Sequence, residues 1–318
     1  MRFRLGKARQ KRMDYFIERL VDGLTLGVIC AVLAISYAIV SGVRRSLIFV
    51  NTAFYLTAIA IVLAVFSGAA ASGFNPIEAL SAGLALISAF VTCAIAAGAA
   101  TEFLPAGIKS SLRPQSLMIS IGALFTAAGI LQFASRLHLP QYLVPAFAPR
   151  VMLVVPGIIR SEFPSVQPVV ITTGAAAIGA IIFLFRHGSF GRKQRAVAQD
   201  PHVAELLGIN VERMISIAII SASMAAALSG WMAIVVSPAT GIGDALLLAV
   251  GSFLGAVLGG LRSLPKAAAG GFAVGVGKAF WSGYFGPDYA WPAILAVLVF
   301  VLILSRPVPG AVVAGGEA

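Results

Sequence analysis

Long apolar stretches are the feature that most constrains what this chain can fold into. A helix of roughly 17 to 25 apolar residues crosses a lipid bilayer and hides its backbone polar groups from the lipid. Hydrophobic residues make up 59% of the 318 positions and charged residues only 11%, whereas soluble domains carry about 25% charged residues. The composition therefore excludes a soluble globular fold and predicts an all-α, polytopic integral membrane protein.

The apolar stretches predict one membrane domain over residues 1–318. We expect a helical bundle of about nine spans, within a range of eight to ten, that can include broken or re-entrant helices. The predicted spans are Gly23–Gly42, Leu47–Phe66, Ala79–Ala100, Leu117–Phe133, Pro168–Phe185, Ile215–Val236, Ala245–Gly260, Ala267–Gly283 and Trp291–Leu304.

The net charge of +11 comes from lysines and arginines that lie mainly in loops and tails. Cytoplasmic loops of membrane proteins carry such an excess, so we interpret the charge as orientation and not as nucleic-acid binding. It places the loop at 186–214 in the cytoplasm and leaves the proline-rich stretch Leu137–Gln167 as an irregular external cap. The basic tail at 1–20 is unresolved by this rule, because its charge favours the inside whereas nine spans put it outside.

The loop from Gly191 to Met214 reads GRKQRAVAQDPHVAELLGINVERM and is the one long polar segment of the second half. Asp200 is a good N-cap and is followed by proline, which suits a first helical position. Gly208 supplies a C-terminal stop, and Asn210 can cap the next helix. These residues predict a short surface helix over 201–207, which is a candidate docking surface for a soluble partner.

A few polar residues lie within the predicted spans. Thr25 and Tyr37 belong to the first span, and Asn51 and Thr52 stand near the start of the second. They would give a substrate pathway a weakly polar lining, suited to a small, partly apolar solute. Asn51 and Thr52 could equally cap a broken helix at a cavity or begin an ordinary helix. Lys278 is either a functional charge or a lysine that reaches toward the membrane surface.

Glycines recur at four-residue spacing in the last third of the chain. Small residues at this spacing let helix backbones approach closely in lipid. The pattern predicts close helix packing, either inside the chain or across a dimer seam, at Gly251, Gly255, Gly259, Gly271 and Gly275.

Groups that would carry catalysis are not evident in the sequence. No nucleophile is accompanied by a histidine and a carboxylate, no metal-ligand spacing occurs, and no phosphate-binding loop of the Walker type is present. Cys30 and Cys93 lie inside apolar spans and are expected to be packing residues. We therefore expect no enzyme activity, no metal and no cofactor, and any ATP-driven step would need an ATPase on a separate chain.

The loop at 191–214 and the span after it resemble the coupling segment of branched-chain amino acid ABC transporter permeases. The resemblance extends to the run AVLGGLRSLPKAAAGGFAVGVGKAF and to the first span, and it is densest from about Gly191 to Phe280. It implies ATPase coupling by residues of this loop. The matching residues, with the proline of the predicted helix, are Gly191, Arg192, Arg195, Asp200, Pro201, Ala204, Leu207, Gly208, Ile209 and Asn210.

The resemblance also implies partners and a location. The expected partners are a second permease subunit, two cytoplasmic ATPases, an extracytoplasmic solute-binding protein and membrane lipid, in a bacterial inner membrane. Ala204 and Leu207 would contact an ATPase. The chain departs from the family pattern at Phe49–Ala53, at Arg262 with Lys266, and at Lys278. The solute would be a branched-chain or related amino acid, with urea, a short amide or another small polar solute as alternatives.

A passive channel or facilitator that works alone is the other interpretation of the sequence. It would not require a capped cytoplasmic helix, and co-purification with an ATPase would discriminate the two.

Overall fold

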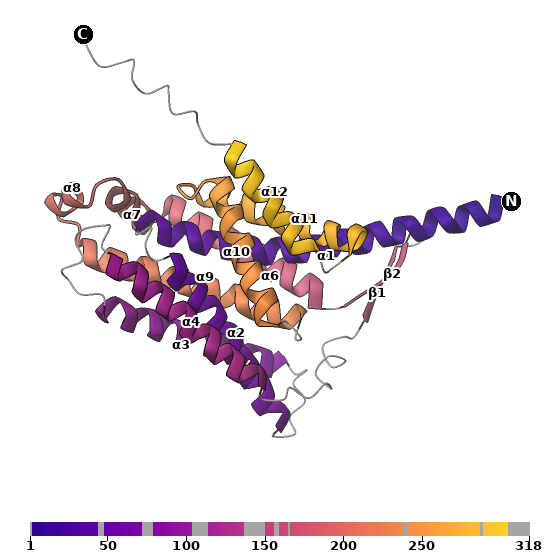
Figure 1. The fold of residues 1–318 in the computed structure, drawn as a ribbon, viewed down its shortest axis with the longest axis horizontal. Coiled ribbons are helices and arrows are strands. Elements are labelled where there is room, and N and C mark those ends of the chain that lie inside the picture. The colour runs from indigo at the N-terminus through magenta and orange to yellow at the C-terminus, as the bar shows by residue number, and fades with distance from the viewer. Residues whose placement is uncertain are drawn as a thin grey trace, which may run out of the picture.

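The structure is a computed structural model that describes residues 2–43, 48–71, 79–103, 114–136, 150–155, 159–164, 166–237, 241–286 and 289–304. These residues form helices and one two-stranded sheet (Figure 1). The elements are α1 (Arg2–Val43), α2 (Ile48–Ala71), α3 (Ala79–Phe103), α4 (Pro114–Arg136), β1 (Arg150–Val155), β2 (Ile159–Pro164), α6 (Val166–His187), α7 (Ser189–Gln199), α8 (Pro201–Leu206), α9 (Val211–Val236), α10 (Ile242–Gly259), α11 (Leu264–Phe285) and α12 (Ala290–Leu304).

The helices have the length and composition of a multi-pass membrane protein. Within the described residues, five helices can cross a membrane by these criteria: Tyr15–Gly42, Phe49–Phe66, Val166–His187, Val211–Val236 and Ile242–Gly259. Shorter apolar helices cover Ala85–Gly98, Ile121–Phe133 and Ala290–Val301. Each of the nine predicted spans overlaps one long helix of the structure. The chain is thus a polytopic helical membrane protein.

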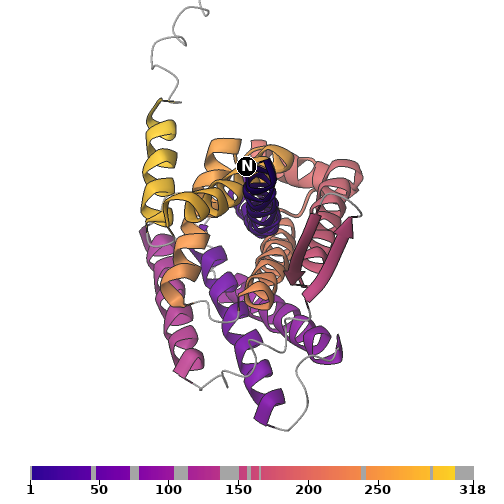
Figure 2. The same cartoon turned by 90° about the vertical axis from the view of Figure 1, so that its right-hand side faces the viewer.

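Helix α1 is the centre of the bundle. It packs most extensively on α11 and also contacts α9, α6 and α10. Viewed nearly along its axis in Figure 2, α1 is surrounded by these later helices. Its buried run from Val28 to Val40 is almost entirely apolar. Helices α2, α3 and α4 form a second group, which joins the first through the contacts of α2 and α3 with α9.

The spaced glycines lie where helices of this chain touch. A Cβ on Gly259 would lie 2.0 Å from the Lys266 carbonyl oxygen of α11, and one on Gly255 would lie 2.9 Å from that of Gly270. On the other side of α11, a Cβ on Gly275 would lie 2.6 Å from the Gly27 Cα of α1. Gly271 faces Cys30 and Ala34, and Gly251 faces Trp291 of α12. All five glycines therefore serve packing within the chain, around α11.

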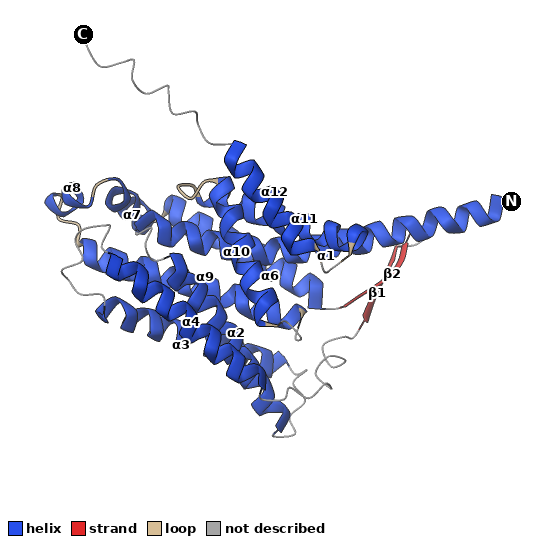
Figure 3. Ribbon diagram, in the orientation of Figure 1, coloured by secondary structure: helices blue, strands red, loops and turns tan. Residues whose placement is uncertain are grey.

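A β-hairpin replaces part of the irregular cap expected over Leu137–Gln167. Strands β1 and β2 pair antiparallel from Arg150 with Pro164 to Val155 with Ile159. β2 contacts α1, and the hairpin lies beside the N-terminal half of that helix (Figure 3). The apolar run RVMLVV of β1 explains the strand, because β-branched residues favour extended backbone. The prolines at 140, 145, 149 and 156 lie outside the described residues.

The two ends of the bundle can be told apart by their contacts. At one end, here called the inner end, the C-terminal ends of α1 and α6 meet α7 and the α10–α11 turn. At the opposite, outer end, the Tyr15 hydroxyl donates to the Gly283 carbonyl oxygen, and Gln167 Nε2 donates to Asp22 Oδ1 at 2.8 Å. The helical segment before Tyr15 therefore starts at the end of the bundle opposite α7 and α8.

Candidate functional site: the α7–α8 module and the polar interior

The loop predicted to couple to a partner forms two helices at the inner end. Asp200 caps α8, since its Oδ1 accepts from the backbone N–H groups of His202 at 2.8 Å and Val203 at 3.2 Å. Pro201 stands in the first turn, as predicted. Gly208 ends the segment with φ +79°, and the Asn210 side chain caps α9 by accepting from the Arg213 N–H at 3.0 Å. The predicted short helix is confirmed, one residue shorter than expected.

The module has a small apolar core of its own. Val197 of α7, Ala204 of α8, and Val211 and Met214 of α9 are buried together. Phe190, Ile209 and Ile215 pack against them. Ala204 is only 1% exposed, so it faces this core and not a partner, contrary to the expectation that it contacts an ATPase. The core fixes α8 relative to α7 and α9.

The outer face of α8 presents apolar side chains to the surroundings. Leu206 is 86% exposed and Leu207 is 72% exposed, and more than half of Val203 is also exposed. Three neighbouring apolar side chains on one capped helix are typical of a surface that a partner covers. Leu207 was expected on this surface. Val203 and Leu206 were missed, although Val203 stands three residues before Leu206 and four before Leu207, a spacing that indicates one helical face.

Helix α7 was not predicted, and it anchors the module to the membrane helices. Gln194 is buried, and its Nε2 donates to the Ile39 carbonyl oxygen of α1 at 3.2 Å. Arg195 donates to the Phe185 carbonyl oxygen of α6 at 3.5 Å. Gly191 lies so close to α6 that a Cβ would be 1.8 Å from the same oxygen. Arg192 is exposed and takes no part in this anchoring.

The polar residues predicted for a substrate pathway divide into two places. Tyr37 of α1 and Thr52 of α2 share a hydrogen bond of 2.8 Å, and Asn51 Nδ2 donates to Ser36 Oγ at 2.7 Å. Thr25 lies twelve residues before Tyr37, which is roughly 18 Å along a helix. Its hydroxyl donates to Val21 of the same helix. The structure thus unites three of the four residues and separates Thr25 from them.

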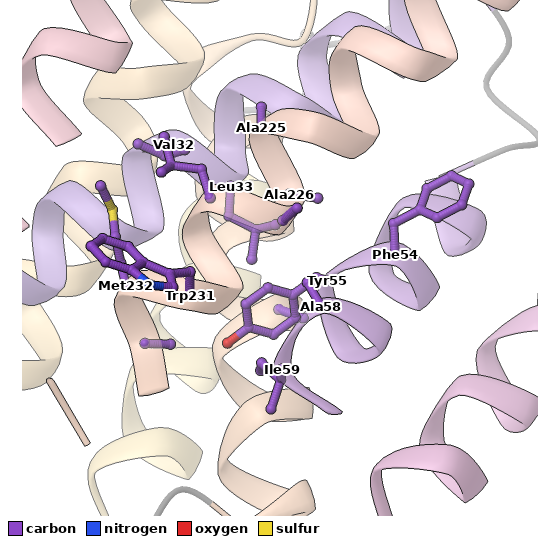
Figure 4. Close-up of a cluster of buried hydrophobic side chains, with 14 of the residues drawn as sticks. Val32, Leu33, Phe54, Tyr55, Ala58, Ile59, Ala225, Ala226, Trp231 and Met232 are labelled. Atoms are coloured by element: carbon purple, nitrogen blue, oxygen red, sulfur yellow. The ribbon is translucent and has the colours of Figure 1, made fainter. Parts of the chain in front are cut away.

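Two buried polar atoms in this cluster have no hydrogen-bond partner: Asn51 Oδ1 and the Tyr55 hydroxyl. Tyr55 follows Asn51 by one helical turn and was not among the predicted residues. Figure 4 shows its ring near Ala58 and Ile59 of α2, pointing toward Trp231 of α9. An unpartnered buried hydroxyl costs free energy, so this pair is the part of the interior best suited to receive a polar group.

Lys278 lies in α11 above the ring of Trp291, with its Nζ 4.5 Å from the ring centroid. This cation–π contact, together with partial burial, accounts for a charge at this position. The side chain packs within the bundle against α12, so neither sequence interpretation, a functional charge or a snorkelling lysine, describes it completely.

Comparison with known proteins shows which family this chain belongs to. Residues 19–304 match the model of the family described as branched-chain amino acid transport system, permease component. The high-affinity branched-chain amino acid transport system permease protein LivH of Salmonella typhimurium is 27% identical over 306 residues, covering 92% of this chain and 96% of the relative.

The permease protein BraD of Pseudomonas aeruginosa, of the same printed description, is 27% identical over 307 residues, covering 92% of this chain and 97% of the relative. LivH of Escherichia coli is 26% identical over 315 residues, with 92% and 96% covered. No solved structure matches. The match over residues 19–304, on a helical membrane bundle with a capped helix at its inner end, shows that the chain belongs to the family of permease components of branched-chain amino acid transport systems.

Proposed function

We propose that this chain is a permease subunit of an ABC importer that carries branched-chain or related amino acids across a bacterial inner membrane. The α7–α8 module is the observation that carries the proposal. A capped helix with Leu206 and Leu207 exposed, held by its own core, is a docking element for a soluble protein. A channel that works alone has no need of it, and the family match supports the same assignment.

The proposal includes nine crossings of the membrane. Each of the helices α1, α2, α3, α4, α6, α9, α10, α11 and α12 overlaps a predicted span. Five of these helices, α1 to α4 and α6, separate Tyr15 from α8, and an odd number of crossings fits their placement at opposite ends of the bundle. The positively charged residues of α7 place the inner end in the cytoplasm. The helical tail at 2–14 then extends on the extracytoplasmic side, where charge alone would not have placed it.

The partners follow from this orientation. Two ATPase subunits dock on α8 of this chain and on the equivalent helix of a second permease. A solute-binding protein delivers the amino acid at the outer end. Val203, Leu206 and Leu207 make the apolar contact, with Arg192 at its border and Ala204 inside the module. The other residues of the segment shape and position this helix: Gly191, Arg195, Asp200, Pro201, Gly208, Ile209 and Asn210.

Coupling proceeds through the anchors of α7. When ATP binding brings the ATPases together, α8 moves as a rigid body with α7, because Val197 and Ala204 share one core. Gln194 and Gly191 pass this movement to α1 and α6. Helix α1 is in close contact with α11 along Gly27, Gly271 and Gly275. Close glycine contacts of this kind let α1 and α11 move relative to each other. This movement switches the side of the membrane from which the solute can reach the interior.

The solute assignment rests on the relatives and on the interior. The relatives are named as branched-chain amino acid permeases. The interior around Tyr37, Asn51 and Tyr55 is apolar apart from a few uncharged hydroxyl and amide groups. Such a lining fits an aliphatic side chain that passes without tight binding. Urea or a short amide would use the same coupling module and is the alternative cargo.

Reconstitution of the full importer in vesicles tests the proposal. We expect leucine uptake that needs ATP on the α8 side and binding protein on the other side, and we expect the ATPases to co-purify with this chain. An excess of unlabelled isoleucine or valine should compete, whereas urea and acetamide should not. Uptake without ATP and without a co-purifying ATPase would establish a passive channel. Competition by urea alone would change the cargo and leave the coupling assignment intact.

A further inference from the structure

A cavity of about 730 Å³ lies at the inner end, beneath α7. Its walls come from the C-terminal ends of α1 and α6, from α7 and from the α10–α11 turn. The volume is within the range of small-molecule sites, about 300 to 1,000 Å³. The coupling proposal uses Gly191, Gln194 and Arg195 of its lining as anchors of α7 and gives the space itself no role.

Three arginines are among the residues that line the cavity, Arg186, Arg195 and Arg262. No aspartate or glutamate is among its lining residues, and within the described part of the chain none of the three arginines pairs with a carboxylate. Arginine stays protonated in proteins, so three like charges border one space without a counter-charge. The cavity therefore favours an anion, and guanidinium groups fit phosphate oxygens especially well.

Uncharged polar atoms in the same lining also lack partners. Gln194 is only 7% exposed, and its amide nitrogen is engaged with Ile39, but its Oε1 has no hydrogen-bond partner. The Ser263 hydroxyl is buried without a partner as well. A carbonyl oxygen accepts only from a donor. A ligand that satisfies both kinds of group carries an anion together with a hydroxyl or ammonium group.

The wall that α6 forms before Arg186 is apolar and lies at the periphery of the chain. Ile182 and Phe185 of α6 line the cavity, and the same helix exposes Phe183 and Leu184 on its outer side. Only 17% of the α6 span is buried, so this helix is on the periphery of the chain. Arg186 follows these apolar residues directly, which is the pattern of a helix that leaves the bilayer at the headgroup level.

We propose that this cavity is a binding site for the headgroup of an anionic phospholipid of the cytoplasmic leaflet. Arg186 and Arg262 bind the phosphate, and Gln194 accepts from a hydroxyl of a headgroup such as that of phosphatidylglycerol. The acyl chains leave along the exposed face of α6. Basic pockets between membrane helices on the cytoplasmic side bind lipids of this class. The site goes beyond the coupling role and does not depend on ATPase docking or on the solute.

Lipid retention by the purified full-length chain tests this site. The protein is exchanged into detergent with equal amounts of phosphatidylglycerol and phosphatidylcholine and then measured by native mass spectrometry. We expect one phosphatidylglycerol retained per chain in preference to phosphatidylcholine. The double variant Arg186→Gln/Arg262→Gln should weaken this retention by about tenfold or more, because each cation near a membrane surface adds to the attraction for anionic lipid. Equal retention of the two lipids by the unmodified protein would overturn the proposal.

Lys193→Gln/Arg213→Gln is the matched control. It removes the same charge from two exposed positions, in α7 and at the start of α9, that do not line the cavity. Retention that falls equally in the control would show a general charge effect and overturn the site. All four substituted residues are exposed, so both variants should elute from a sizing column at the same volume as the unmodified protein. If a variant does not, the test rests on whether the unmodified protein retains phosphatidylglycerol in preference to phosphatidylcholine. Inorganic phosphate added to lipid-depleted protein distinguishes a lipid headgroup from a free anion as the ligand. Stabilisation of the protein by phosphate, without retention of phosphatidylglycerol, would overturn the lipid site and assign a free anion instead.

Discussion

Gly208 has a backbone conformation that few other residues adopt. Its φ is +79°, and no atom lies within 4 Å of the place where a Cβ would stand. Its N–H donates to the Glu205 carbonyl oxygen, and the Ile209 N–H donates to that of Ala204. These bonds close the end of α8 and satisfy its last carbonyl groups. A substitution of Gly208 would therefore strain the backbone, although there is space for the new side chain.

Replacing Gly208 by valine should uncouple ATP hydrolysis from uptake. A β-branched residue in the left-handed region costs about 1 to 2 kcal/mol, which favours reorientation of the segment that joins α8 to α9. We expect the chain to insert normally and uptake per ATP hydrolysed to fall severalfold in reconstituted vesicles.

Gly208→Asn is the control for this change, because asparagine tolerates the left-handed conformation. It should retain most of the coupling. Equal uptake per ATP in the valine variant and the unmodified chain would contradict the role given to this turn.

At the residue scale, the caps were predictable and the long-range partners were not. Asp200 and Asn210 bind N–H groups two or three residues away, so their chemistry is written in adjacent positions. Gln194 binds Ile39, which is 155 residues distant. Spaced glycines show that helices come close, but nothing in their spacing says that Gly275 meets Gly27. Such contacts depend on the packing of the whole bundle.

Helix α8 has one face inside the module and one face outside it. Ala204 packs inward, whereas Leu206 and Leu207 face outward. Full burial of a leucine side chain stabilises a complex by about 1.5 to 3 kcal/mol. The outward face should therefore hold most of the apolar contribution to ATPase binding from this chain.

The double variant Leu206→Ser/Leu207→Ser should weaken ATPase binding by at least about tenfold, the factor that about 1.4 kcal/mol produces. Co-purification and a titration of the ATPase against the permease in detergent measure the change. Tyr289→Ser removes a comparably exposed side chain between α11 and α12 and should leave the affinity unchanged. An affinity equal in both variants would refute docking on α8.

At the element scale, α7 and the β-hairpin were missed for different reasons. α7 is amphipathic, with Gly191, Gln194 and Val197 buried on one side and Arg192 and Lys193 exposed, but its many polar and basic residues suggested a loop. The hairpin strand RVMLVV stands in a proline-rich stretch, and those prolines suggested irregular backbone. The long apolar helices were predictable because bilayer thickness sets their length.

For the whole molecule, the arrangement of the ends makes a test of topology. Glu18 and Tyr289 are exposed near the outer end, and Lys193 is exposed at the inner end. Both native cysteines are buried, so they give little background labelling. We expect a membrane-impermeant maleimide to label Glu18→Cys and Tyr289→Cys from the extracytoplasmic side and Lys193→Cys only in inverted vesicles.

Labelling of Glu18→Cys and Lys193→Cys from the same side would show that an even number of helices crosses the membrane between them, and not the five proposed. It would also remove the basis for nine crossings. The sequence left this point open because two rules disagreed about the N-terminal tail. In the structure the contact between Tyr15 and Gly283 brings the start of the apolar span of α1 to the end of α11, as the parity rule requires.

The unbroken course of α1 has a mechanical consequence. From Tyr15 to Gly42 the helix has 28 residues, which is about 42 Å at 1.5 Å per residue. The bond between Gln167 and Asp22 holds it at the outer end of the bundle, and the bond between Gln194 and Ile39 holds it at the inner end. A continuous helix resists compression along its axis, so α1 can transmit a force from one of its ends to the other. In the proposed importer, a force applied at the outer end, where the solute-binding protein would dock, is therefore transmitted along α1 to α7.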